Sequence, residues 1–218
     1  MGEVSELIRS ERLALIDLLE TLTPGEWATP SLCSAWTVQD VAAHLAWAPA
    51  LPMPRATVEL VRSGFRINAM IADSAVRWSG RGTAAILDQL RTNAADGAKP
   101  FGMPEESALA DAVAHALDIR RPLDRPRPIP QEAFAHAAHF FVGPSSRWPL
   151  SVVVGGGARE RIDGLHLGAD DLDWSYGQGQ EVHGSAEALM LLLTGRVVEP
   201  DEFSGPGSAQ LRARLRAP

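Results

Sequence analysis

The sequence predicts an α+β protein, with a bundle of helices in its first part and a small α/β domain in its second. Apolar residues recur at helical spacing as far as about residue 141, whereas beyond that point short apolar runs alternate with glycines. Four prolines between residues 122 and 130 predict a stiff connector. We therefore expect two domains, residues 1–145 and 146–218, and the 45% of apolar residues suffices for a sizeable core.

The helices of the first part are predicted from apolar spacing and from capping residues. Thr23–Glu26 and Thr37–Asp40 both fit the [ST]-x-x-[DE] capping box, in which a hydroxyl and a carboxylate satisfy backbone amides at a helix start. Prolines and glycines set the helix ends, as at Gly97 and Pro122. The expected helices span residues 4–22, 37–47, 56–78, 83–95, 104–121 and 131–141.

Strands are predicted only in the second part of the chain. Ser151–Val154 form an apolar run, and the glycines at 155–157 predict a turn after it. Residues 159–167 predict a second strand. Trp174 and Tyr176 lie two positions apart, as residues on one face of a strand do.

One more helix and a polar tail complete the predicted domain. Ser185 can cap a strongly apolar helix over residues 186–194, and Gly195 can end it in the left-handed conformation. The tail from Glu199 onward is rich in glycine, proline and charge, so we expect it to be loosely held.

Composition excludes several classes of protein. The net charge is −7, and no basic stripe is interleaved with aromatic residues, which argues against a nucleic-acid partner. No run approaches the roughly 18 apolar residues of a transmembrane helix, and the N-terminal residues do not form a signal peptide, so we expect a cytoplasmic protein without a membrane partner. The only cysteine is Cys33, so any metal must be bound mainly through nitrogen and oxygen.

Three residues could bind a metal. Asp111 and His115 lie four positions apart and therefore on one helical face, with Asp118 close to the same face. Together with His44 from another helix, this pair would make a three-ligand site with an open position, as catalytic zinc sites have. Spacing alone leaves alternatives, because the Asp111 face could be the solvated one and His44 could be a hydrogen-bonded core histidine.

Several segments together resemble a known family. Residues 32–45, LCSAWTVQDVAAHL, resemble the L-C-x-G-W-[ST]-x-x-[DE]-x-x-x-H-[LI] signature of the mycothiol-dependent maleylpyruvate isomerase family. Residues 111–123, DAVAHALDIRRPL, resemble its second signature, in which an acid precedes a histidine by four positions and D-[IL]-R-R-P-L follows. Ala35 stands where glycine is usual, and Asp111 where the isomerase commonly has glutamate. Later segments resemble the family's C-terminal domain; they span residues 173–177, 184–186 and 193–196.

The resemblance implies a fold and a metal site. The implied fold is a DinB-like four-helix bundle joined to a small domain related to sterol-carrier proteins. The implied metal is zinc, or another divalent ion, with His44, Asp111 and His115 as its ligands. Asp111 is shorter than glutamate by one methylene, so either the helix lies closer to the metal or the site is looser.

The resemblance also implies an enzyme, either a mycothiol-dependent isomerase or an S-transferase. Mycothiol would be the thiol cosubstrate, activated for attack on a small electrophilic substrate that carries a carboxylate. Asp118 would position His115, and Arg196 would bind the substrate carboxylate. Arg120 and Arg121 would contact the thiol. A thiol-independent zinc hydrolase and a non-catalytic small-ligand-binding protein remain as alternatives, and the protein is expected to be a monomer or a homodimer.

Overall fold

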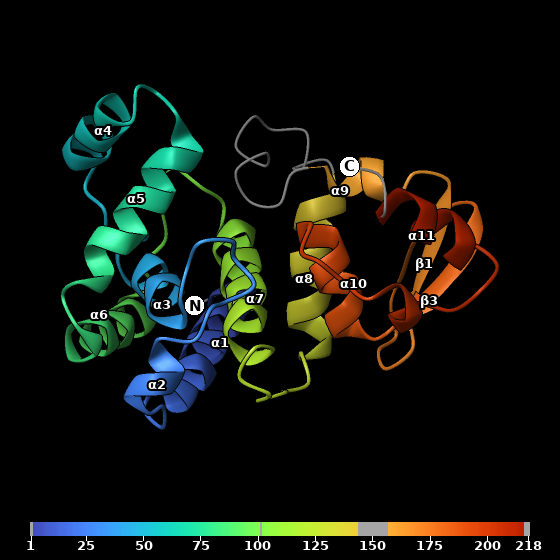
Figure 1. The fold of residues 1–218 in the computed structure, drawn as a ribbon, viewed down its shortest axis with the longest axis horizontal. Helices are drawn as coiled ribbons and strands as arrows, with labels where there is room; N and C mark the ends of the chain where they lie inside the picture. The colour runs from blue at the N-terminus through green and yellow to red at the C-terminus, as the bar shows by residue number, and fades with distance from the viewer. Residues whose placement is uncertain (1, 101, 144–156, 216–218) are drawn as a thin grey trace. The chain divides into compact units, whose positions relative to one another are not determined.

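The computed structural model describes residues 2–100, 102–143 and 157–215. By their contacts the residues divide into two compact units, 1–127 and 128–218. Figure 1 shows helices throughout the first unit and a small sheet with helices in the second, which confirms the predicted α+β class. The strand predicted at 151–154 lies outside the described residues. No helix in the described ranges has the length and apolar character that a membrane crossing requires.

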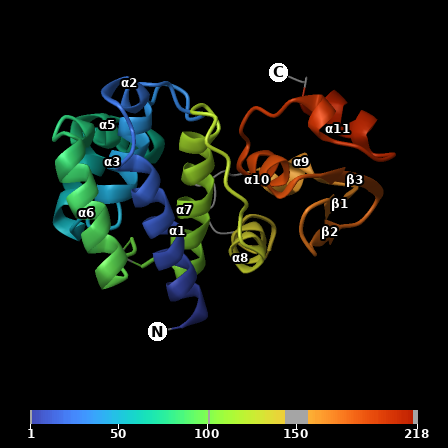
Figure 2. The ribbon, with the colours of Figure 1, turned by 90° about the horizontal axis from the view of Figure 1, so that it is seen from below.

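Four helices form the bundle of the first unit. α1 packs against α6 and α7, and α3 packs against the same two helices, an arrangement that can be followed in Figure 2. Apolar side chains from α1, α3 and α6 fill the space between them. The four helices are α1 (Glu3–Leu19), α3 (Val38–Trp47), α6 (Thr83–Asp96) and α7 (Glu105–Arg120).

Both predicted capping boxes are present. The Thr23 hydroxyl accepts from the Glu26 amide while the Glu26 carboxylate accepts from the Thr23 amide, and this starts the short helix α2 (Pro24–Trp27). Thr37 and Asp40 make the same reciprocal pair at the start of α3. The second box matters for function, because it fixes where α3 begins and hence which face of that helix carries His44.

The prediction of a single helix over residues 56–78 is wrong. The structure has two helices instead, α4 (Met53–Arg62) and α5 (Ile67–Ser79). Gly64 and Phe65 between them both have positive φ angles, and the Phe65 amide bonds to the carbonyl of Leu60. This left-handed turn ends α4, as a left-handed glycine commonly does after the last residue of a helix. α4 buries none of its side chains, whereas α5 packs closely against α3.

The second unit is built around a three-stranded sheet with the order β2-β1-β3. β1 (Leu165–Ala169) pairs antiparallel with β2 (Ser175–Gly177) and parallel with β3 (Gln180–Gly184). α10 (Ala186–Thr194) packs against β1 and against the helices α8 (Gln131–Val142) and α9 (Ala158–Arg161). As predicted, the Ser185 hydroxyl caps α10, and Gly195 ends it in the left-handed conformation.

Two predictions for this unit are wrong. Residues 158–161 form the helix α9, so the strand expected from residue 159 begins only at Leu165. The tail expected to be loosely held is ordered as far as Leu215, with a 3-10 turn η3 (Pro200–Glu202) and the helix α11 (Ser208–Leu215). Leu211 explains the second difference, because its side chain is only 1% exposed and secures α11 to the unit.

The helix α8 belongs by its contacts to the second unit. It packs against α10 and α9, and the Tyr176 hydroxyl donates to the Val142 carbonyl at 2.9 Å. The predicted domain boundary at residue 145 puts this helix in the first domain, whereas the contacts divide the chain between residues 127 and 128. The domain bounds 1–145 and 146–218 stay a prediction.

Candidate metal centre

The structure brings the three predicted ligand residues together. His44 comes from α3, and Asp111 and His115 come from successive turns of α7. The Oδ1 atom of Asp111 lies 3.6 Å from Nε2 of His44 and 3.4 Å from Nε2 of His115. The two imidazole rings meet edge to face, with 5.0 Å between their centroids. All three donor atoms therefore converge on one point between the helices.

These separations fit a metal better than a hydrogen-bonded cluster. Two ligand atoms bound at about 2.1 Å with a tetrahedral angle lie roughly 3.4 Å apart, whereas a hydrogen bond between nitrogen and oxygen has a mode near 2.9 Å. Nδ1 of His44 is buried and has no partner among the described residues. A metal-binding histidine usually hydrogen-bonds its other ring nitrogen as well, so this atom does not distinguish a ligand from a core histidine. The ligand separations alone favour the metal site.

The charges of the cluster are mutually dependent. Burial alone would raise the pKa of the Asp111 carboxyl, but the imidazoles of His115 and His44 hold that pKa far below its usual range. Burial would likewise lower the pKa of His115, yet Asp111, Asp118 and Cys33 raise it well above its usual value. The Asp111 carboxylate and the imidazoles thus stabilise each other's charged forms, and a bound divalent cation would take the place of the imidazolium proton beside Asp111.

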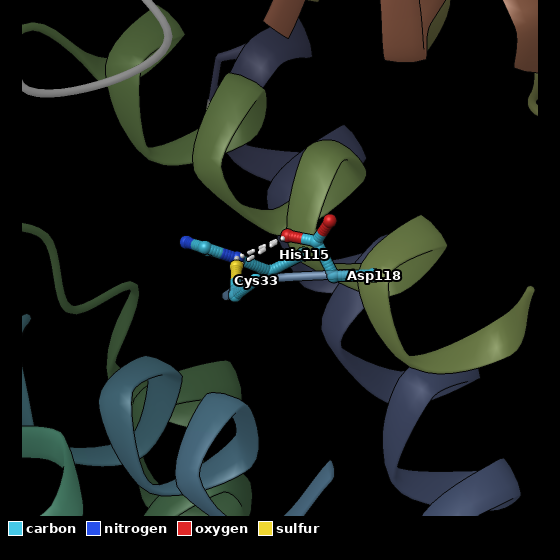
Figure 3. A group of neighbouring side chains, drawn as sticks. All are labelled: Cys33, His115 and Asp118. Atoms are coloured by element: carbon cyan, nitrogen blue, oxygen red, sulfur yellow. Dashed lines mark hydrogen bonds and ion pairs between the residues drawn. The ribbon is translucent and has the colours of Figure 1, made fainter. Parts of the chain in front are cut away.

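A second group of side chains lies on the other side of the His115 ring. Nδ1 of His115 is 2.8 Å from Oδ2 of Asp118, and the Cys33 thiol donates to the same oxygen at 3.0 Å. Figure 3 shows the three side chains meeting at the His115 ring. Cys33, His115 and Asp118 are also near enough to be considered as metal ligands, but 2.8 and 3.0 Å are hydrogen-bond distances.

This group orients the imidazole. The buried Asp118 carboxylate accepts the proton of Nδ1, so in the neutral ring the lone pair of Nε2 faces Asp111 and His44. The resemblance implies that Asp118 positions His115, and the observed contact is consistent with that role. The role itself stays a prediction. The thiol of Cys33 was not expected in this network, because no local pattern links it to a residue 85 positions away.

Trp36 lies in the first signature segment, residues 32–45, and the resemblance implies no role for it. Its ring centroid lies 5.4 Å from that of His44 and 6.2 Å from that of His115, so the indole covers both histidines. The turn that carries it is tied to α7, since the Leu32 amide donates to the Asp118 carbonyl at 3.1 Å. A tryptophan next to a cap that starts a histidine-bearing helix is the signal that could have identified it.

Ala35 gives this turn an unusual backbone conformation. Its φ angle is +67°, in the left-handed region, where the family signature has glycine. A left-handed conformation costs an L-residue roughly 1–2 kcal/mol, a cost that glycine does not have. Glycine, however, gives the unfolded chain more conformational entropy, and this offsets about 0.4–1 kcal/mol of the gain in stability. We expect Ala35→Gly to raise the free energy of unfolding by about 0.5–1 kcal/mol.

Urea denaturation would measure this change. The matched control is Ala84→Gly, an exposed position in the first turn of α6, where the same substitution should lower the free energy of unfolding by about 0.5–1 kcal/mol. Equal destabilisation by both substitutions would contradict the strained conformation assigned to Ala35.

The three arginines predicted to contact substrate or thiol make contacts with the backbone. Arg120 donates to the Ala14 carbonyl at 2.7 Å and so connects α7 to α1. Arg121 is the C-cap residue of α7. In the second unit, Arg196 donates to the Thr194 carbonyl at 3.0 Å, just after α10. The expected contacts of these arginines with a thiol or a substrate stay predictions.

Comparisons with known proteins point to one family. The chain is similar to the crystal structure of the mycothiol-dependent maleylpyruvate isomerase, with 15% identity, a TM-score of 0.49, and coverage of 94% of this chain and 92% of that chain. A histidine-to-alanine mutant of that enzyme matches with the same coverage and TM-score at 16% identity. No curated protein sequence matches. The family model for the mycothiol maleylpyruvate isomerase N-terminal domain matches residues 8–137, more than half of the chain. The chain therefore belongs to the family defined by that domain.

Proposed function

We propose that this protein is a zinc-dependent enzyme that activates mycothiol for addition or transfer to a small electrophile bearing a carboxylate. The observation that carries the proposal is the convergence of His44, Asp111 and His115, at separations typical of ligands around a tetrahedral ion. Family membership supports mycothiol as the thiol. The chain's one cysteine donates a hydrogen bond to Asp118 and lies on the Nδ1 side of the His115 ring, whereas Nε2 faces Asp111, so the proposal takes the reacting thiol from outside the chain.

Each residue has a definable task under this proposal. His44, Asp111 and His115 would bind the zinc ion and leave one position open. When bound, the ion would supply a positive charge that favours the deprotonated form of a thiol at that position. Asp118, 2.8 Å from Nδ1 of His115, would accept the Nδ1 proton and fix the direction of that ring, while the Trp36 indole beside both imidazoles would limit their contact with water. Arg196 would bind the substrate carboxylate, since a guanidinium pairs with a carboxylate bidentately.

Cobalt substitution tests the proposal directly. The protein should contain one divalent metal per chain by elemental analysis, and its cobalt form should develop an intense near-ultraviolet band when mycothiol is added. Thiolate ligation to cobalt produces such a band, whereas oxygen and nitrogen ligands do not. His44→Ala should abolish the band, while His139→Ala, an exposed histidine of α8, should leave it unchanged. Normal metal content without a band for any thiol would overturn the thiol-activation proposal and favour the hydrolase.

The role of Asp118 can be tested separately. Asp118→Asn keeps the shape of the side chain but removes the charge that orients His115, so we expect metal affinity to fall about 10–100-fold. Competition with a chromophoric chelator would measure this affinity. The matched control is Asp88→Asn on the exposed surface of α6, which should change the affinity less than twofold. Unchanged affinity in a folded Asp118→Asn protein would show that the carboxylate does not position the ligand.

A further inference from the structure

A cavity of about 570 Å³ opens in the first unit, between the end of α3 and the helices α4, α5 and α6. It contains none of the three proposed metal ligands, and neither Cys33 nor Asp118 lines it. Its volume lies within the range of about 300–1,000 Å³ that small-molecule sites occupy. Leu51, Pro52 and Val58 contribute apolar wall, together with the rings of Trp47 and Trp78.

The charged lining of this cavity is unbalanced. Four arginines line it, namely Arg55, Arg62, Arg77 and Arg81, against the single carboxylate of Glu59, which leaves an excess of three positive charges. Glu59 is shared by Arg62, at 3.6 Å, and Arg77. Within the described part of the chain, no carboxylate pairs with Arg55 or Arg81.

Arg81 is also held in a defined orientation. Its guanidinium carbon lies 4.5 Å from the centroid of the Trp47 ring, a cation–π contact. A stacked guanidinium keeps its N–H groups in one plane and loses little further entropy when it binds an anion. Its N–H groups can therefore serve a planar carboxylate or a phosphate bidentately.

We infer that this cavity binds a small organic anion, a carboxylate or a phosphate ester with an apolar body. The acidic group would lie between Arg55 and Arg81, and the apolar body would pack against Trp78 and the wall formed by Leu51, Pro52 and Val58. The inference does not depend on the metal or on the thiol chemistry proposed above, since the cavity shares no residue with the candidate metal centre.

Calorimetry with three probes of one shape tests the inference. 2-Naphthoate and 2-naphthyl phosphate carry the two possible acidic groups, and 2-naphthol is the neutral match near pH 7. At least one of the anions should bind in a saturable manner and at least tenfold more tightly than 2-naphthol. The stronger of the two anions identifies the acidic group. Binding should persist in His115→Ala, which separates this cavity from the proposed metal centre.

Arginine variants test which residues bind the anion, with one arginine outside the cavity as the control. Arg81→Gln and Arg55→Gln should each weaken anion binding about tenfold, because each removes a charge-assisted hydrogen bond. Arg66→Gln removes the same charge from an exposed residue outside the cavity and should leave affinity within twofold. Equal weakening by all three variants would mean general surface attraction and overturn the inference. Equal affinity for 2-naphthol, or no saturable binding of either anion at millimolar concentration, would overturn it as well.

Discussion

Replacing His115 with alanine is expected to remove the metal while leaving the helices in place. His115 contacts both Asp111 in the ligand group and Asp118 behind it. The binding free energy of a four-ligand zinc site, about 10–16 kcal/mol, corresponds to roughly 2.5–4 kcal/mol for each ligand. We therefore expect the affinity for zinc to fall roughly a hundred- to a thousandfold.

The fold should survive this substitution. The core of the bundle is made of buried apolar residues from α1, α3 and α6, so it does not depend on a bound ion. Elemental analysis would report the metal, and circular dichroism the helices, with His139→Ala as the control that removes an exposed imidazole. An unfolded His115→Ala protein would mean that the site is structural, and the proposal of catalysis would weaken.

Replacing Asn93 with alanine is expected to have the largest effect on stability among the polar residues of the bundle. Asn93 lies on α6 and is 1% exposed. Its Nδ2 atom donates to the carbonyl of Ala46 at 2.7 Å and to that of Leu45 at 3.3 Å. Both carbonyls belong to the last turn of α3, where a helix leaves its acceptors without partners. The side chain thus completes the end of the helix that carries His44.

The alanine variant would leave these buried acceptors without a donor. Each unsatisfied buried group costs about 1–3 kcal/mol, so the free energy of unfolding should fall by about 2–5 kcal/mol. Urea denaturation would measure the loss. Asn68→Ala on the exposed face of α5 is the matched control and should change the free energy by less than about 0.5 kcal/mol. A small effect at Asn93 would mean that water replaces the amide at the end of α3.

Local chemistry made most of the fold predictable. A hydroxyl and a carboxylate three residues apart are enough to specify a helix start, and both predicted boxes are present at Thr23 and Thr37. The break at Gly64 was missed because a single glycine within a helical pattern costs only about 1 kcal/mol and often does not end the helix. The ordered tail was missed because its composition is polar and the burial of Leu211 depends on contacts outside the segment.

The ligand residues of the candidate site could be predicted from the sequence, but the contacts that surround them could not. The four-residue spacing of Asp111 and His115 places both on one face of α7. His44 was one candidate for the third ligand, and the resemblance identified it as that ligand. Contacts between remote residues gave no such signal. Cys33 reaches Asp118 across 85 positions, and Arg12 donates to the Asn93 carbonyl across 81. No periodicity or motif encodes such pairs, because they arise only when the helices have packed.

The exposed position of the helix α4 means that it can open locally while the rest of the protein stays folded. It buries no side chain and packs mainly on α5, so little free energy opposes its local opening. Such opening would leave the packing between α3 and α7 intact, and the ligand residues on those two helices would keep their geometry. We therefore expect the amide hydrogens of α4, which forms one wall of the arginine-lined cavity, to exchange with solvent through local opening of this helix. This exchange does not require the whole protein to unfold. The first unit thus combines the packed helices that carry the predicted ligands with a helix, α4, whose order a bound anion would increase.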